Sequence, residues 1–212
     1  MISPFLSNNK NQVGCRIPNN EISLSLLSII DFPIAAPSAN IATRTSVTSI
    51  DDLDYKLKEI FYIDGGSSVL GLESTVIKTT KNGCKILRLG SLTIEDIKIK
   101  FPKYKISIDQ SDVSPGNQLK HYSPIKPIRI NVDFVKKNET LLNFGINELT
   151  SDIKSLNLSI EENLSDASYN FYNYLNILDS INCSGIAVAP IPDQGLGKTI
   201  NDRLRRASYK DE

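Results

Sequence analysis

Six polar side chains have the types and positions needed to bind an anionic small molecule. They fall in loops or at the ends of expected strands, and they are Ser38, Asn40, Ser74, Thr75, Arg88 and His121. Hydroxyl and amide groups can donate to phosphate or ribose oxygens, and an arginine can hold a phosphate or carboxylate through two hydrogen bonds. A histidine can stack on a base or contact a phosphate. This chemistry binds and orients substrates.

Four of these residues also have an ordinary structural interpretation. Ser38 and Asn40 lie two apart, so extended backbone would point both side chains to one side, but a Ser or Asx turn explains the pair as well. Arg88 could be a solvated surface charge, and His121 could be a simple loop residue. Without nearby Cys, Asp or Glu ligands, a lone histidine is a poor candidate for a metal site or a catalytic triad.

The basic tail leaves a similar choice open. Residues 197–209 place Ile200, Leu204 and Ala207 on one helical face. The cationic residues beside that face are Lys198, Arg203, Arg205 and Arg206. They could hold RNA phosphates, or they could form an ordinary solvated helix face.

Composition restricts the class of protein. The chain has 212 residues, 40% of them hydrophobic, and 24 basic residues balance 24 acidic ones. This is typical of a globular protein of one or two domains, and zero net charge excludes a whole-protein basic field for nucleic acid. Three scattered cysteines fit neither a disulfide framework nor a zinc site, so we expect a reducing cytosol. The sequence shows no signal peptide and no membrane-crossing segment, which predicts a cytoplasmic protein without membrane contact.

The elements that must position these residues follow from local patterns. The first half predicts strands over 13–18, 32–36 and 61–63, helices over 22–30, 50–58 and 93–101, and a hairpin that pairs 74–79 with 84–88. No clear hydrophobic periodicity is found between residue 101 and residue 127, so we expect a linker there. The second half predicts strands over 128–132, 140–144 and 185–189 and a helix over 166–178, which indicates a small α/β unit.

Several motifs together resemble one family. In chain order they are Val13-Gly14-Cys15-Arg16-Ile17-Pro18, Pro33 to Asn40 (PIAAPSAN), Asp64-Gly65-Gly66, Gly71 to Val76 (GLESTV), Ile86 to Gly90 (ILRLG), Ser114-Pro115-Gly116, His121-Tyr122-Ser123-Pro124, Gly195-Leu196-Gly197 and Asn201 to Ala207 (NDRLRRA). Their types and order resemble the two-domain threonylcarbamoyl-AMP synthases of the Sua5/YrdC/YciO family.

The resemblance implies an α/β fold with three parts. Residues 1–105 would be the C-terminal part of a truncated, twisted YrdC-like domain, residues 106–126 a linker, and residues 127–212 a small Rossmann-like Sua5 domain. The implied enzyme is a nucleotidyltransferase that joins L-threonine, bicarbonate and ATP into threonylcarbamoyl-AMP, releases pyrophosphate, and serves the t6A modification of tRNA. Mg²⁺ would accompany the ATP.

The resemblance also assigns residues. Ser38, Asn40, Arg88, His121 and Tyr122 would bind ATP. Arg16, Ser74 and Thr75 would lie at the threonine and carbamate end of the site. No residue is assigned as a catalytic group or as a metal ligand, because adenylation can proceed through positioning and charge stabilisation without a protein nucleophile.

Two family motifs that hold threonine and triphosphate do not occur in this sequence. We therefore expect the isolated chain to have little activity unless a separately encoded N-terminal half completes it. Two alternatives stay open: a nucleotide- or RNA-binding module with weak tRNA contact and no turnover, and a non-functional remnant of a split gene.

Overall fold

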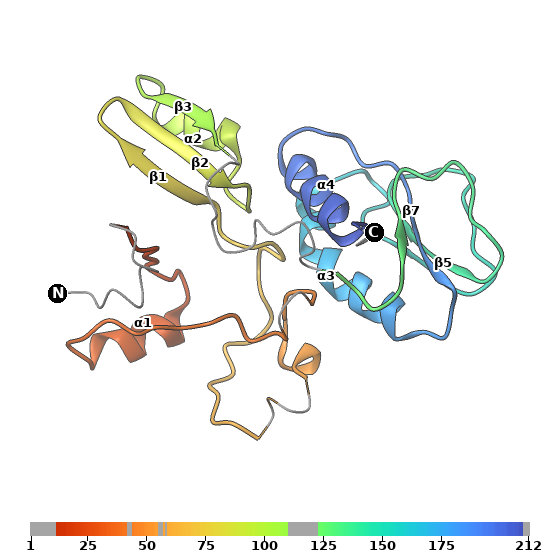
Figure 1. Ribbon diagram of the computed structural model, residues 1–212, viewed down its shortest axis with the longest axis horizontal. Coiled ribbons are helices and arrows are strands. Elements are labelled where there is room, and N and C mark those ends of the chain that lie inside the picture. The colour runs from red at the N-terminus through yellow and green to blue at the C-terminus, as the bar shows by residue number, and fades with distance from the viewer. Residues whose placement is uncertain (1–11, 42–43, 55–56, 58, 110–122, 210–212) are drawn as a thin grey trace. The chain divides into compact units, whose positions relative to one another are not determined.

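The computed structural model describes residues 12–41, 44–54, 57, 59–109 and 123–209, and it confirms the α/β class (Figure 1). Contacts between residues divide the chain into two compact units. One comprises Met1–Pro37 with Ile63–Gly65, and the other comprises Ser38–Tyr62 with Gly66–Glu212. The domain boundaries expected from the sequence, at residues 105 and 127, stay a prediction.

The described part of the smaller unit contains one helix, α1 (Glu21–Ser28), close to the expected range. Asn20 begins it, because the side-chain oxygen of Asn20 accepts a hydrogen bond from the Ser23 backbone N–H at 2.9 Å. None of the eight residues of α1 is buried. Ile22 and Leu24 are exposed, and Leu26 and Leu27 are half-buried.

Three expected strands are absent from the described residues, so these predictions were wrong. Residues 13–18, 32–36 and 61–63 have irregular backbone instead. A β-strand exists only when a neighbouring strand pairs with its N–H and C=O groups. The apolar runs in these segments indicate strand propensity, but no neighbouring strand pairs with them in the described part of the chain.

The larger unit begins with irregular backbone and one short turn. The helix expected over 50–58 is reduced to the 3-10 turn η1 (Ile50–Asp52), and three of its later positions lie outside the described residues. Asp52 accepts hydrogen bonds from the backbone N–H groups of Thr48 and Ser49 at 3.0 and 3.2 Å. This carboxylate fixes the start of the turn.

The hairpin is confirmed, and a third strand joins it. β1 (Val76–Thr80) pairs antiparallel with β2 (Gly83–Arg88), which pairs parallel with β3 (Lys105–Ile108). Between β2 and β3 lies α2 (Ile94–Lys100), the expected helix, which begins at a reciprocal cap between Thr93 and Asp96. The sequence analysis missed β3, which lies in the segment where it found no period.

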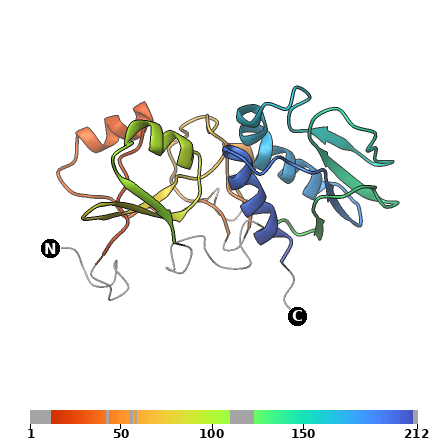
Figure 2. The same ribbon diagram turned by 90° about the horizontal axis from the view of Figure 1, so that it is seen from above.

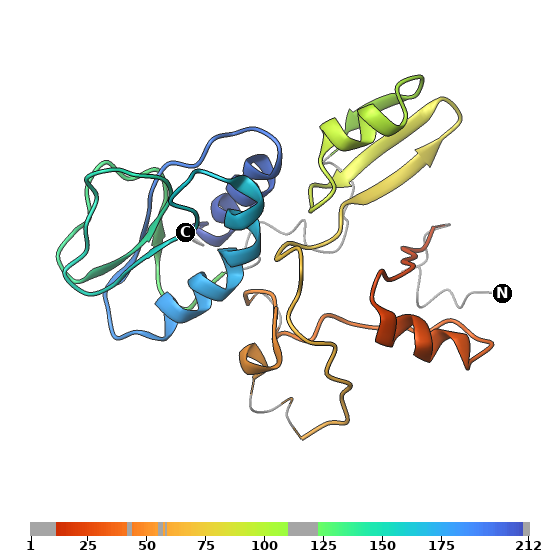
Figure 3. The same cartoon turned by 180° about the vertical axis from the view of Figure 1, so that it is seen from behind.

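The second half forms a parallel sheet of order β4-β7-β5-β6 (Figures 2 and 3). Its strands are β4 (Ile128–Arg129), β5 (Glu139–Asn143), β6 (Ser155–Asn157) and β7 (Gly185–Val188). α3 (Leu164–Ser180) packs on β5 and β7, and α4 (Leu196–Ala207) packs on α3. The three strands and two helices expected here are confirmed, whereas β6 was missed.

The core of this half lies between the sheet and its helices. Leu142 from β5 joins Phe171 and Leu175 from α3 and Ile200 from α4 in one buried cluster. Leu141, the neighbour of Leu142, joins a smaller cluster with Val132 and Ala187, as the alternation of side chains along a strand requires. Both faces of β5 are therefore buried.

Candidate functional site

The loop before β1 is anchored to α3 through Gly71. This glycine has a φ of +66°, and a Cβ atom built on it would lie 2.0 Å from the Ser168 carbonyl oxygen. The Ser168 hydroxyl donates to the Leu70 carbonyl at 3.2 Å. Only glycine permits this backbone conformation together with this close approach. These contacts fix the position of the loop before β1 relative to α3.

The same loop is held on its other side by Gly90. A Cβ atom built on Gly90 would lie 2.3 Å from both the Glu73 carbonyl oxygen and the Thr75 nitrogen. The backbone N–H of Ser91 donates to the Glu73 carbonyl at 2.9 Å. The two backbones lie in direct contact, which places the end of β2 beside the loop.

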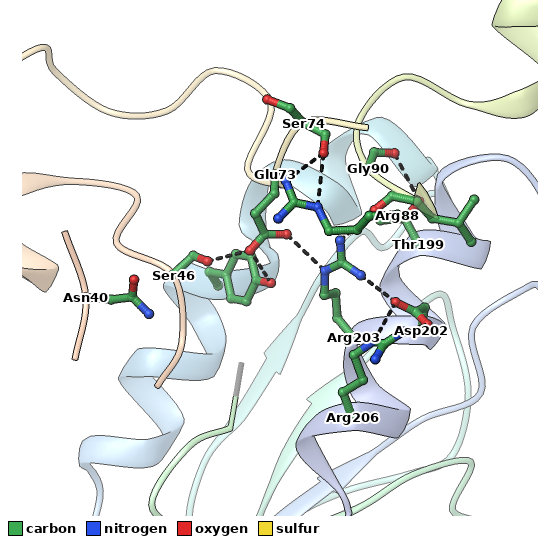
Figure 4. A network of polar contacts seen from close by, with 12 residues as sticks. Asn40, Ser46, Glu73, Ser74, Arg88, Gly90, Thr199, Asp202, Arg203 and Arg206 are labelled. Carbon is green, nitrogen blue, oxygen red and sulfur yellow. Dashed lines mark hydrogen bonds and ion pairs between the residues drawn. The ribbon is translucent and has the colours of Figure 1, made fainter. Parts of the chain in front are cut away.

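This contact brings together three of the residues expected to bind substrates, and Figure 4 labels two of them, Ser74 and Arg88. The guanidinium of Arg88 donates to the Ser74 carbonyl from Nε at 3.3 Å and from Nη2 at 2.8 Å. The Thr75 hydroxyl donates to the Leu92 carbonyl at 2.6 Å. Ser74, Thr75 and Arg88 thus form one cluster of neighbouring backbone segments, in which the Arg88 guanidinium is hydrogen-bonded to the Ser74 carbonyl and the Thr75 hydroxyl is hydrogen-bonded to the Leu92 backbone.

For the other expected site residues, the described part of the chain shows no contact that would test their roles. Ser38 is exposed, and the amide of Asn40 donates to the Arg44 carbonyl at 3.0 Å, so Asn40 holds its own turn. Arg16 is exposed in the smaller unit. His121 and Tyr122 lie outside the described residues. Their assignment as ligand-binding residues stays a prediction.

The sequence analysis missed the role of Glu73 at the centre of this region. One carboxylate oxygen accepts hydrogen bonds from the Ser46 and Tyr172 hydroxyls, the latter at 2.7 Å, and the other oxygen accepts from Arg203 Nε at 2.9 Å. Burial alone would raise the pKa of Glu73, but the charge of Arg203 and the three hydrogen bonds lower it below its usual value. Glu73 is therefore held ionised.

Nothing local in the sequence could have revealed this glutamate's partner. Glu73 and Arg203 are 130 positions apart, and each lies in a segment that has a sufficient local interpretation, a loop and a polar helix face. The one available signal is the presence of a carboxylate inside the GLESTV motif, and it names no partner.

The basic tail is correspondingly less exposed than its composition indicates. Arg203 has a fully buried side chain, and Arg206 donates to Asp202 at 3.1 Å. Lys198 pairs with Glu95 at 3.1 Å. The hypothesis that the tail arginines hold RNA phosphates is therefore wrong for Arg203, because a side chain without solvent exposure cannot reach a phosphate. Arg205 is exposed.

The described residues show neither a metal cluster nor a membrane-spanning helix. No group of three or more His, Cys, Asp and Glu side chains among them could hold a metal ion. In this part of the chain, no helix combines the length and apolar character needed to cross a bilayer. Cys15, Cys84 and Cys183 are free thiols.

Two family profiles match the chain. Residues 1–90 match the Sua5, YciO and YrdC family, described as telomere recombination, and residues 92–208 match the family described as the C-terminal domain of threonylcarbamoyl-AMP synthase. Threonylcarbamoyl-AMP synthase of Pyrococcus abyssi is 28% identical over 92% of the chain, and that of Bacillus subtilis is 27% identical over 98%.

Solved structures show the same similarity. The crystal structure of P. abyssi Sua5 complexed with L-threonine matches 98% of this chain, with a TM-score of 0.79 and 26% sequence identity. The match covers 67% of the P. abyssi chain. The present chain spans 64% and 66% of the lengths of the two curated synthases above. Since its second half alone matches a Sua5-specific family profile and its whole length follows a Sua5 fold, this chain belongs to the Sua5 family.

Proposed function

We propose that this chain takes part in making L-threonylcarbamoyl-AMP for the t6A modification of tRNA. The similarity of 92% or more of its length to named threonylcarbamoyl-AMP synthases is the observation that carries the proposal. The P. abyssi relative was crystallised with L-threonine, which supports threonine as a substrate. ATP and bicarbonate are the other two substrates. The cytoplasmic location expected from the sequence stays a prediction.

The reaction requires positioning rather than a protein nucleophile. The threonine nitrogen combines with bicarbonate to give a carbamate and water. A carbamate oxygen then attacks the α-phosphorus of ATP, the bond to the β-phosphate breaks, and pyrophosphate leaves. Oriented donors and cations lower this barrier by holding the reactants in line and stabilising charge on the phosphates.

Particular residues would supply these donors. Arg88, with Ser38, Asn40, His121 and Tyr122, would hold the nucleotide. Three further residues would bind the substrates at the threonine and carbamate end of the site: Arg16, Ser74 and Thr75. Mg²⁺ would enter with ATP and neutralise phosphate charge. The contact between Arg88 and the Ser74 carbonyl supports this assignment, because it brings a residue of the nucleotide end beside the loop that carries Ser74 and Thr75.

We further propose that turnover needs the residues that make up the remaining third of the relatives' length in addition to those of this chain. Apolar side chains in the first 70 residues support this requirement, because they are exposed in the described structure. Those exposed by more than three quarters are Ile17, Ile29, Phe61 and Val69. Alone, the chain should bind nucleotide but turn over little.

Binding to the purified chain tests the first half of the proposal. Isothermal titration with ATP and Mg²⁺ should show saturable heat, and Arg88→Ala should weaken that binding by roughly tenfold or more, as expected for loss of a charged hydrogen bond. Arg205→Ala removes an exposed arginine outside the site and should leave the affinity unchanged. Absence of ATP binding by a folded chain would remove nucleotide chemistry from the proposal.

Turnover tests the second half. Pyrophosphate release that needs ATP, L-threonine and bicarbonate should rise when a fragment equivalent to the first third of the B. subtilis relative is added. Salt-sensitive RNA retention with no turnover in that mixture would instead favour the alternative of a binding module. A chain that is rapidly proteolysed throughout and binds nothing would favour the non-functional remnant.

A further inference from the structure

The helix α4 forms hydrogen bonds to the candidate site at two segments, the loop before β1 and the backbone after β2. Arg203, on α4, donates from Nε to the Glu73 carboxylate at 2.9 Å and from Nη2 to the Leu89 carbonyl at 2.6 Å. One turn earlier, the Thr199 hydroxyl donates to the Gly90 carbonyl at 3.0 Å. A single helix therefore holds both the loop before β1 and the backbone that follows β2.

The ion pair between Arg203 and Glu73 is held in one orientation by burial and by neighbouring hydrogen bonds. The Arg203 side chain is fully buried, and that of Glu73 is 15% exposed. Asp202 accepts a hydrogen bond from Arg203 Nη1, so the guanidinium is held from behind while Nε faces Glu73. Tyr172 from α3 and Ser46 hold the other carboxylate oxygen. Each group fixes the orientation of the next.

Buried ion pairs are weak evidence for stability, because desolvation offsets most of their attraction. The geometry here has a more specific consequence. Glu73 is the immediate neighbour of Ser74, and the Leu89 carbonyl immediately follows Arg88. The segments that α4 holds are thus the two that carry the Ser74, Thr75 and Arg88 cluster.

We propose that Arg203 is a positioning residue: through Glu73 and Leu89 it fixes the segments that carry Ser74 and Arg88, and it thereby sets the geometry of the site at both the threonine end and the nucleotide end. The inference deepens the proposed function and rests on it for the identity of the ligand. It assigns the C-terminal half an indirect part in substrate binding, because Arg203 itself touches no substrate.

Hydrogen exchange of the full chain tests the geometric step without any ligand. In Arg203→Lys, which keeps the charge but loses the fork of donors, amides in residues 71–76 and 88–92 should exchange at least about tenfold faster. Amides of β5 and β7 should keep their wild-type rates. Arg205→Lys, an exposed arginine on the same helix, is the matched control and should change neither region.

Substrate binding tests the consequence. Arg203→Lys should raise the dissociation constants for L-threonine and for ATP about tenfold each while the amides of β5 and β7 keep their wild-type exchange rates, whereas general destabilisation would accelerate exchange in those strands as well. Glu73→Gln keeps the side-chain shape and should give the same pattern, which covers the case in which Arg203→Lys fails to fold. In the double variant, the loss should be smaller than the product of the single losses.

The outcomes separate this inference from the proposed function. If wild-type chain binds neither ligand, the proposed function fails, and the exchange rates of residues 71–76 still decide whether Arg203 positions the loop. If wild-type chain binds threonine and both variants retain its affinity and the wild-type exchange rates, Arg203 has no positioning role.

Discussion

Replacing Gly90 by alanine would place a methyl group where the backbone of residues 73–75, in the loop before β1, already lies. The new Cβ atom would sit 2.3 Å from the Glu73 carbonyl oxygen and the Thr75 nitrogen, and 2.4 Å from the Ser74 carbonyl carbon. All three neighbours are backbone atoms, so no side-chain rotation can relieve the clash. The two segments must separate by roughly 1 Å to reach ordinary van der Waals contact.

The cost follows from the contacts that this separation disturbs. Overpacking of a close contact costs about 1–3 kcal/mol. Separation also stretches the Ser91–Glu73 backbone hydrogen bond of 2.9 Å and the Thr199–Gly90 hydrogen bond of 3.0 Å, and each such bond contributes about 0.5–1.5 kcal/mol. We therefore expect Gly90→Ala to lower the free energy of unfolding by about 2–4 kcal/mol.

Urea denaturation followed by circular dichroism measures this loss. With a dependence of about 2 kcal/mol per molar urea, the midpoint should fall by about 1–2 M. Gly14→Ala is the control, because nothing lies within 4 Å of a Cβ atom at that position, and it should change stability by less than about 1 kcal/mol. An unchanged midpoint for Gly90→Ala would refute the close contact between the loop and the end of β2.

Three further predictions concern the groups that hold the fold around the site. The folded protein lowers the pKa of Glu73 below its usual 4.5, so the ionised carboxylate stabilises the fold above that pH. This contribution is lost as the pH falls through the lowered pKa. Glu73→Gln should therefore lose less stability than wild type between pH 7 and pH 3 in urea titrations. Glu139→Gln weakens the two 2.8 Å contacts from Arg129 and should lower the free energy of unfolding by about 1–3 kcal/mol at pH 7; equal midpoints for variant and wild type would contradict this. Leu175→Ala opens a cavity in the core beneath α3 and should cost about 2–5 kcal/mol by the same assay, against less than about 0.5 kcal/mol for the exposed Ile160→Ala.

Local chemistry was enough to predict several elements. The β1–β2 hairpin follows from β-branched runs around a turn, and α2 follows from the reciprocal cap of Thr93 and Asp96. The spacing of Ile200, Leu204 and Ala207 predicts the buried face of α4, and all three are buried. These signals are encoded within a few residues of each other, so no distant contact is needed to interpret them.

Strands were predicted less well, because a strand is defined by its partner. The runs at 13–18, 32–36 and 61–63 have strand-like composition but irregular backbone, whereas β3 and β6 are four and three residues long and exist because β2 and β5 pair with them. Short segments carry too little pattern to predict pairing from the sequence alone.

The order of the motifs by itself determined the family, and the residue types within them identified Ser74, Thr75 and Arg88 as candidate ligands. Only the tertiary structure decided that these three lie together, because their contact depends on Gly90 lying against the backbone of residues 73–75. It also decided the role of Arg203. An arginine on a polar helix face has the same local pattern whether it meets solvent or a carboxylate 130 positions away, and the burial that separates the two cases arises when α4 packs against the loop.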